Sequence, residues 1–236
     1  MIEVRNLQVR YGERLVADVP ELDVGPGECV AIVGESGSGK TTTLMALLGL
    51  TEGAHVTGNI RIGGSEDLRS VRGSKAALVM QSPQSALSPT TRLGTLMRRA
   101  LKRHGIAQTG MNDAVEAVML DPDILRRYPH EVSGGQAQRF AIALAIALGA
   151  EVILADEPTS ALDVTVQAEV VGVLRRLREE RGLAVLLVSH DLALVSTIAD
   201  RVLVMKDGQV VESGPAASVL AEPAHPYTRE LLEALP

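Results

Sequence analysis

The chain has 236 residues, which is enough for one large α/β domain or for a domain with a small subdomain. Its 23 lysines and arginines against 29 aspartates and glutamates give a net charge of −6, which argues against general affinity for nucleic acid, although a local basic patch remains possible. Aromatic residues make up only 2% of the chain, too few for a surface that stacks single-stranded bases.

The N-terminal part of the chain is rich in strand signals. Four segments show the residue pattern of strands, and turn residues separate them. They predict strands over 2–9, 15–24, 28–33 and 58–62. Cys29 lies in one of these apolar runs, so we expect a buried thiol, and as the only cysteine it excludes an intrachain disulfide or a cysteine-ligated cluster. The opening "MIEVRNLQVRYG" begins at once with strand-like alternation and without a basic-then-apolar leader, so we expect no export and a cytosolic location.

The stretch "GESGSGKTT" (34–42) lies between the apolar run "CVAIV" and the helical pattern "TLMALLGL". It fits the phosphate-loop pattern G-x-x-x-x-G-K-[ST] at Gly34, Gly39, Lys40 and Thr41, with the required strand before it and helix after it. Glycines let several backbone N–H groups face one anion, and the following helix points its positive end at the same place. We therefore expect Lys40 to reach the β- and γ-phosphates of a nucleotide and Thr41 to ligate Mg²⁺, in preference to a plain surface turn.

From residue 93 to residue 148 the apolar spacing becomes helical. The first helix of this block carries a basic cluster, which consists of Arg98, Arg99, Lys102 and Arg103. The cluster would lie largely opposite the apolar face, where a solvated helix face is favoured over a binding patch. The longest apolar stretch, "FAIALAIALGA" (140–150), is well short of the ~20 residues of a spanning helix, so we expect that this chain does not cross a membrane by itself.

After residue 151 apolar strands alternate with helices. The strands are "VILAD", "AVLLVS" and "RVLVM", and the helices are expected over 164–181 and 192–199. Strands that are apolar throughout and separated by helices predict a parallel sheet covered on both faces. The following "KDGQVV" predicts a hairpin turn at Asp207 and Gly208.

Acidic residues follow the strand "VILAD". Asp156 would hold Mg²⁺ through its water shell, and Glu157 would polarise the attacking water. Both can serve one crevice because they stand at the C-terminal end of a strand, whereas alone they could equally form a helix-capping turn. His190 ends a strand of the same sheet and would hydrogen-bond the γ-phosphate or the water, because no other histidine has metal-ligand spacing with it.

The stretch "VSGGQAQR" (132–139) is not explained by a single nucleotide site. Ser133 predicts an N-cap for the apolar helix that follows, and Gly134 and Gly135 expose N–H groups, which makes a second anion-binding helix end. This second site lies far from Lys40 in the sequence. Capping alone would account for the serine but leaves the Gly-Gly-Gln unexplained.

Taken in order, "GESGSGKTT", Gln81, "VSGGQ", "ILADEPTSALD" and "SHD" resemble the nucleotide-binding subunit of an ABC (ATP-binding cassette) transporter, over nearly the whole chain. The signature stretch "VSGGQ" is diagnostic when it lies shortly before the acidic strand, and here Asp156 stands 23 positions after Ser133. The resemblance implies an α/β fold with a P-loop NTPase (RecA-like) core over 1–84 and 151–236. It also implies an antiparallel β subdomain and an α-helical subdomain inserted at about 85–150.

The resemblance further implies a shared site. Two such domains would close head to tail, with each ATP between the phosphate loop of one and the signature of the other, so that Ser133 and Gly135 touch the γ-phosphate. Tyr11 matches the aromatic residue that stacks on adenine, and Gln81 matches the glutamine that senses Mg²⁺ and the water. Asp163 matches the residue that signals across the dimer.

These assignments give a complete expected site with ATP and Mg²⁺ as its ligands. The expected nucleotide contacts are Tyr11, Gly34, Ser36, Gly37, Ser38, Gly39, Lys40, Thr41, Thr42, Ser133, Gly134, Gly135, Gln136 and Asp163. The expected catalytic residues are Glu157, His190 and Gln81, and the expected metal contacts are Thr41, Gln81 and Asp156. The signature has Val132 where leucine is commoner in the family, a conservative departure that should not harm the site.

Two further stretches, "MQSPQSALSPT" and "HPYTRELLEALP", resemble the ABC importers of peptides and nickel. Such importers combine two permeases, two ATPases and an extracytoplasmic substrate-binding protein, which implies a peripheral subunit at the cytoplasmic face of the inner membrane and no nucleic acid partner. The loop "QSPQSALSPT" leads into helices that this family uses to grip a permease, and Leu87 is its one large apolar side chain. Many peptide-importing members carry clustered cysteines in a longer C-terminus, so the single Cys29 favours nickel or metallophore import.

Several alternatives stay open from the sequence. The working dimer could be homotypic or could pair this chain with a sister ATPase. An accessory ATPase of phosphonate degradation resembles the same "HPYT" segment, and genes for permeases or for carbon–phosphorus lyase beside this one would separate the two. A soluble ABC ATPase of DNA repair or translation usually shows coiled-coil or tandem-domain additions, and a small-molecule kinase has no use for "VSGGQ".

Overall fold

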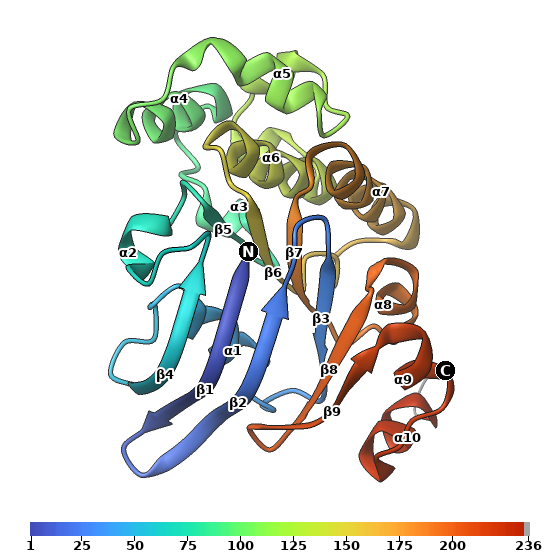
Figure 1. Cartoon of the computed structure of the whole chain (residues 1–236). Coiled ribbons are helices and arrows are strands. Elements are labelled where there is room, and N and C mark those ends of the chain that lie inside the picture. Colours follow the sequence, from blue (N-terminus) through green and yellow to red (C-terminus); the bar gives the residue numbers. More distant parts are fainter. Residues whose placement is uncertain (234–236) are drawn as a thin grey trace.

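The computed structural model describes residues 1–233, and the last three residues of the segment "HPYTRELLEALP" lie outside this part. Within it, nine strands form one sheet in the order β4-β1-β2-β9-β8-β3-β7-β6-β5 (Figure 1). Helices lie on both faces of this sheet, and the helical block that contains α4 and α5 stands at the top of the molecule in Figure 1. The predicted α/β fold is confirmed.

One end of the sheet is antiparallel. Its strands are β1 (Ile2–Tyr11), β2 (Arg14–Val24) and β4 (His55–Ile62). The strand predicted over 58–62 begins earlier, at His55, because its first residues continue the pairing with β1 up to Arg10. β2 meets the rest of the sheet at a single residue pair, Asp18 with Gln209 of β9, so the antiparallel part is joined to the parallel part by few backbone bonds.

The other part of the sheet is largely parallel, as the sequence predicts. Its parallel strands are β3 (Cys29–Val33), β5 (Ala76–Val79), β6 (Val152–Asp156), β7 (Ala184–Val188) and β8 (Arg201–Lys206). β9 (Gln209–Pro215) returns antiparallel to β8 through the predicted turn. Asp207 and Gly208 both have positive φ there, 48° and 83°, as a tight two-residue hairpin requires.

The helices alternate with the strands as expected. The α-helices are α1 (Lys40–Leu47), α2 (Leu68–Val71), α3 (Pro83–Ala86), α4 (Leu93–Arg103), α5 (Met111–Glu116), α6 (Gly134–Ala147), α7 (Val164–Arg181), α8 (Leu192–Ile198), α9 (Ala216–Ala221) and α10 (Pro226–Glu233). Short 3₁₀ turns are η1 (Gln108–Gly110), η2 (Pro122–Arg126) and η3 (Pro129–Glu131). The helix predicted over 164–181 has those bounds, and the one predicted over 192–199 ends one residue earlier. Among residues 1–233, no helix combines the length and the apolarity needed to cross a membrane.

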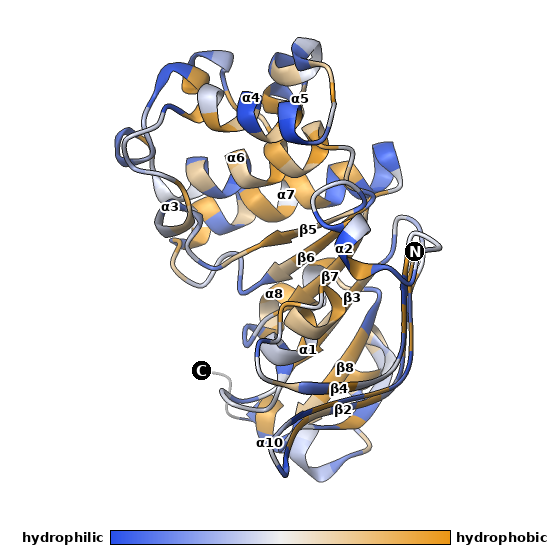
Figure 2. Ribbon diagram, turned by 90° about the vertical axis from the view of Figure 1, so that its left-hand side faces the viewer, coloured by the Kyte–Doolittle hydropathy of each residue, from blue (hydrophilic) through white to orange (hydrophobic). Residues whose placement is uncertain are grey.

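The strands bury both faces, so the core has two parts. Alternate residues of β3 enter different clusters: Val30 and Ile32 pack with α1 and the antiparallel strands, whereas Ala31 and Val33 pack with α4 to α8. Cys29 is fully buried, as predicted. Figure 2 shows the parallel strands as mostly hydrophobic between the covering helices. Because the helical block shares one cluster with the sheet, its position is fixed by the same apolar packing that stabilises the core.

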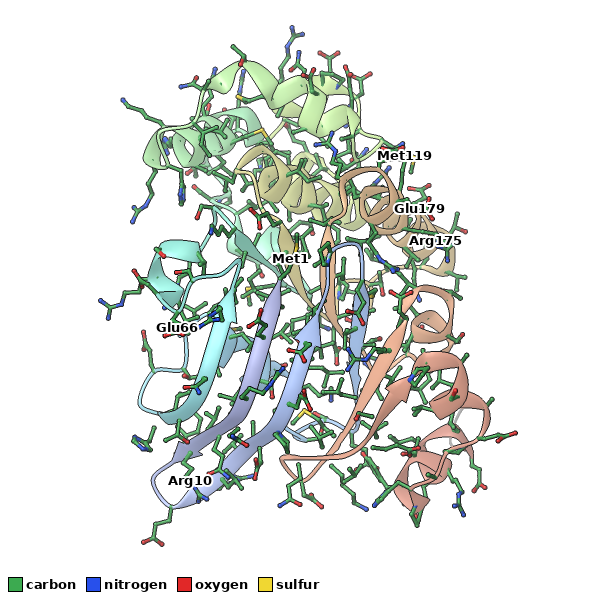
Figure 3. The ribbon with its side chains drawn as sticks, in the orientation of Figure 1. Met1, Arg10, Glu66, Met119, Arg175 and Glu179 are labelled. Carbon is green, nitrogen blue, oxygen red and sulfur yellow. The ribbon has the colours of Figure 1, made fainter. Side chains whose placement is uncertain are left out.

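Two arginines fasten the helical block to α7. Arg139 of α6 donates from Nη1 to the Met119 carbonyl oxygen at 3.1 Å, and its Nη2 lies 3.1 Å from a carboxylate oxygen of Glu169 in α7. Arg176 of α7 donates to the Ala117 carbonyl oxygen. Figure 3 shows Met119 at the edge of the block beside α7. The segment that follows α5 is therefore held by charged hydrogen bonds from both α6 and α7.

Candidate functional site

The functional side chains follow the carboxyl ends of four neighbouring strands. In the sheet order β3-β7-β6-β5, the phosphate loop follows β3 and His190 follows β7. Asp156 ends β6 with Glu157 next to it, and Gln81 stands two residues after β5. The carboxyl ends of parallel strands meet at one edge of a sheet. The fold therefore brings together residues that are far apart in the sequence.

The phosphate loop is held from behind by other backbone segments. A Cβ on Gly34 would lie 2.1 Å from the Met205 carbonyl oxygen, and one on Gly39 would lie 2.4 Å from that of Val16. Both glycines have positive φ, so a side chain at either position meets strain as well as collision. The Gly208 amide also donates to the Ser38 carbonyl oxygen at 3.1 Å. Glycine is therefore required where the loop packs against β2 and the β8–β9 hairpin.

Lys40 places a buried ammonium group at the base of the phosphate loop. Its side chain is at the base of the loop, 6% exposed, and Nζ donates to the carbonyl oxygens of Gly34 at 2.8 Å and Glu35 at 2.7 Å. No carboxylate oxygen of residues 1–233 lies within ion-pair distance of it. Burial lowers the pKa of Lys40, and the negative charges of Glu157, Asp156 and Glu35 oppose that shift. A buried ammonium without a counter-ion is a site prepared for an anionic ligand.

Thr41 and Asp156 form a pair of oxygen ligands. The Thr41 hydroxyl donates to Asp156 Oδ1 at 3.0 Å. Burial raises the pKa of Asp156, and the neighbouring Glu157 charge raises it further, while the hydrogen bond from Thr41 and the charge of Lys40 oppose the shift. Adjacent oxygens around an octahedral ion with bonds of ~2.1 Å are about 3 Å apart. The spacing of the two oxygens therefore fits contact with Mg²⁺, either directly or through a water molecule bound to the metal.

Glu157 and His190 meet across two strands. Glu157 has a positive φ of 46°, and its amide donates to the Val188 carbonyl oxygen at 2.9 Å, which turns the chain sharply after β6. Its Oε1 lies 3.1 Å from His190 Nδ1. Next to the histidine, Asp191 caps α8 and accepts a hydrogen bond from Gln167 of α7 at 2.9 Å. The carboxylate and the imidazole are thus held side by side and partly open to solvent, as proton-handling groups must be.

The signature forms a capped helix start. Ser133 Oγ accepts from the Gln136 amide at 3.2 Å, while Gln136 Oε1 accepts from the Ser133 amide at 3.0 Å. A Cβ on Gly135 would lie 2.1 Å from Val166 Cγ1, so this glycine lets α6 pack against α7. Capping and packing therefore account for Gly135 and Gln136, which the sequence left unexplained. None of the hydrogen bonds within residues 1–233 joins this segment to the phosphate loop.

The other expected residues lie on several different elements. Tyr11 is 42% exposed at the end of β1, where it pairs with Arg14 of β2. Gln81 is exposed at the strand edge. Asp163 caps α7, where its Oδ1 accepts from the Val166 amide at 3.0 Å. The remaining expected residues are Ser36 and Gly37 in the exposed part of the loop, Thr42 in α1 and Gly134 at the start of α6.

Two residues at the site were missed from the sequence. The hydroxyl of Tyr227, in the "HPYT" stretch, accepts from the Glu35 amide of the phosphate loop at 3.0 Å. Buried Gln138 of α6 donates to the Met80 carbonyl oxygen at 3.4 Å, just before Gln81. The "HPYT" stretch could have drawn attention to the tyrosine, but no local pattern shows that the two ends of the chain meet.

An apolar groove lies beside the segment that follows Gln81. It has a volume of about 370 Å³. Its large apolar lining side chains are Leu48, Leu50, Leu78, Met80, Leu87, Leu144 and Leu148. Leu87 is half-buried and also packs against the main core cluster. Leu50 and Met80 are 41% and 43% exposed, so the groove presents apolar surface to solvent.

The chain is similar in sequence and in fold to known proteins. A family model described as ABC transporter matches residues 18–160. Over its full length the chain is 43% identical to a Brucella abortus protein that is named for peptide import, covering 77% of it. It is 40% identical to a similarly named protein of Brucella ovis, covering 78%. A dimeric ATP-binding cassette bound to ADP and Pi in a post-hydrolysis state has a TM-score of 0.77 and 29% identity, over 92% of this chain and 99% of that one. CbiO1 of Clostridium perfringens shares the fold, with a TM-score of 0.79 and 24% identity over 94% of this chain and 90% of that one.

Proposed function

Because this chain belongs to the ABC transporter family and is an ATPase of that family, we propose that it energises the import of di- or oligopeptides. The observation that carries the use of ATP is the sheet edge at which buried Lys40 lies beside the Thr41–Asp156 pair and the Glu157–His190 pair. Both Brucella relatives are named for peptide import, which favours peptides over the nickel or metallophore substrate that the sequence favoured.

The phosphate loop would bind and neutralise the nucleotide. Lys40 would exchange its carbonyl partners for the β- and γ-phosphate oxygens, which supply the missing counter-charge. Thr41 and Asp156 would hold Mg²⁺, which when bound neutralises charge on the phosphates. Metal binding would keep Asp156 ionised, against the rise in its pKa that burial causes.

Glu157 and His190 would manage the attacking water. In hydrolysis the water oxygen bonds to the γ-phosphorus, the bond from that phosphorus to the β–γ bridging oxygen breaks, and ADP and phosphate leave. The Glu157 carboxylate would accept a hydrogen bond from the water and orient it. His190, whose Nδ1 lies 3.1 Å from the carboxylate, would fix the position of that carboxylate, and its other ring nitrogen would accept a hydrogen bond from the water.

A second ATPase would complete each site. Ser133 is exposed at the start of α6, and within residues 1–233 nothing links it to the phosphate loop. We infer that the signature of one subunit closes on the nucleotide held by another, either a second copy or a sister chain. Tyr11 would stack on adenine, while Gln81 and Asp163 would report the state of the nucleotide. The dimeric cassette with ADP and Pi supports this arrangement by similarity.

The apolar groove would receive a helix of a permease. Its lining comes from β5, α3, α6 and the loops that follow α1 and α2, so it spans the junction between residues 1–84 and 151–236, the proposed core, and the proposed helical subdomain at about 85–150. When two subunits close around ATP, both sides of the groove would move, and the docked helix would move with them. The partners would then be two permeases and an extracytoplasmic binding protein, with this subunit at the cytoplasmic face of the inner membrane.

Copurification and uptake together test the function. The tagged chain should bring down two permease subunits from detergent-solubilised membranes, and the reconstituted complex should take up a labelled dipeptide only with ATP. Uptake of ⁶³Ni²⁺ or of a metal chelate in place of the dipeptide would replace the peptide assignment by the metal one. Recovery of carbon–phosphorus lyase subunits without permeases would refute the transport function.

A further inference from the structure

A tyrosine near the C-terminus contacts the back of the phosphate loop. Tyr227 of α10 is 2% exposed, and its hydroxyl accepts a hydrogen bond from the Glu35 amide at 3.0 Å. That amide belongs to the same peptide group as the Gly34 carbonyl oxygen, which accepts from Lys40 Nζ at 2.8 Å. One peptide group is therefore held on its two sides by the tyrosine hydroxyl and by the lysine ammonium.

The tyrosine ring is itself fixed in place. Lys206 Nζ, at the end of β8, lies 4.5 Å from the ring centre, within the range of a cation–π contact. Burial raises the pKa of Tyr227, so its hydroxyl stays neutral at physiological pH. A neutral phenol can accept the amide hydrogen bond and still donate its own proton to a further acceptor.

The segment that carries the tyrosine is docked by one carboxylate. Glu212 of β9 accepts hydrogen bonds from the amides of Ala224 at 2.8 Å and His225 at 3.0 Å, and from the Thr228 hydroxyl. Burial raises the pKa of Glu212, but these hydrogen bonds outweigh it and lower the pKa. Because β9 also forms the hairpin that backs the phosphate loop, the C-terminal segment and the loop share one support.

We propose that Tyr227 is a positioning residue, which fixes the Gly34–Glu35 peptide and through its carbonyl oxygen aligns Lys40 with the phosphates. The proposal rests on the phosphate-loop assignment in the proposed function. Hydrogen bonds that share one peptide group polarise one another, so loss of the hydroxyl both frees the peptide to rotate and weakens its hold on the lysine. Tyr227 acts from behind the loop and would not touch the nucleotide.

The test compares two variants of the same segment by the affinity for ADP, measured by isothermal titration calorimetry. Tyr227→Phe removes only the hydroxyl and should raise the Kd for ADP about fivefold, which is about 1 kcal/mol at 1.4 kcal/mol per factor of ten. Thr228→Val removes a docking bond to Glu212 without a contact to the loop, and should leave the Kd within twofold. Hydrogen exchange of the Glu35 amide should accelerate in Tyr227→Phe alone.

A double-mutant cycle tests the route through the lysine. In a Lys40→Ala background, adding Tyr227→Phe should change the ADP affinity by less than twofold, because the hydroxyl acts through the missing ammonium. An unchanged Kd and amide exchange in Tyr227→Phe, an equal weakening in Thr228→Val, or a full effect in the Lys40→Ala background would each overturn the inference. Failure of the unsubstituted chain to bind ADP would instead contradict the proposed function.

Discussion

Replacing Leu87 by aspartate should uncouple hydrolysis from transport. Leu87 is half-buried in the apolar groove, so a docked permease helix would cover its remaining surface, worth about 1 kcal/mol of the ~2 kcal/mol for a whole leucine. A carboxylate in the same apolar contact adds a desolvation cost of about 2 kcal/mol after relaxation. The sum of about 3 kcal/mol lowers docking affinity on the order of 100-fold.

The same change should leave the isolated subunit nearly unaffected. The Leu87 side chain is apolar and forms no hydrogen bond with Lys40, Asp156 or Glu157. Losing a half-buried leucine costs about 1 kcal/mol of the 5–15 kcal/mol of unfolding free energy that is typical of a domain. The assays are ATP hydrolysis by the purified subunit and ATP-dependent uptake by the reconstituted complex.

Two matched variants control for the introduced charge. Ala86→Asp places the same charge in the groove without deleting a packed side chain, and should also reduce uptake. Val56→Asp places it on the exposed edge strand β4, outside the groove, and should leave uptake near normal. Unchanged uptake in Leu87→Asp, or an equal loss of uptake and of subunit hydrolysis, would refute the docking role of the groove.

Three further predictions concern binding, stability and reactivity. Tyr11→Ala should raise the KM for ATP about tenfold with little change in kcat, because a stacked base contributes about 1–3 kcal/mol of binding. A selective loss of kcat would show that Tyr11 does not stack on the adenine. Arg178→Leu should lower the free energy of unfolding, measured in urea, by about 2–4 kcal/mol, because this nearly buried guanidinium donates to the Gly27 and Ile198 carbonyl oxygens. A loss below about 1 kcal/mol would contradict a stabilising role of these hydrogen bonds. Burial raises the pKa of Cys29 to about 12, so a thiol reagent at pH 8 should modify Cys29 only after unfolding, and rapid labelling of the folded chain would be inconsistent with this core.

The sequence is most informative where function and backbone geometry need the same residue types. The phosphate loop, the acidic pair after "VILAD" and the strand–helix alternation were predicted because glycines, charged residues and apolar periods are visible locally. The helix predicted over 164–181 from the apolar pattern has those bounds in the structure, where Asp163 caps its start and Gly182, with φ 64°, ends it.

Long-range contacts could not be predicted in the same way. The hydroxyl of Tyr227 meets Glu35 across 192 residues, and Gly39 is required because it touches the Val16 backbone, which no local pattern shows. Gly135 was taken as an anion-binding residue, yet its contact with Val166 shows a packing requirement as well. Such residues depend on which elements become neighbours, and that is decided by tertiary packing.

The most direct test of the central claim is Glu157→Gln, studied by ATP hydrolysis and by sedimentation with and without ATP. The amide cannot accept a proton from the water, whereas Lys40, Thr41 and Asp156 keep their contacts, so hydrolysis should fall at least about 100-fold while ATP binding persists. ATP should then hold two subunits together as a stable dimer that ADP does not support. Near-normal hydrolysis, or a monomer at saturating ATP, would contradict the assignment of Glu157 and the shared nucleotide site.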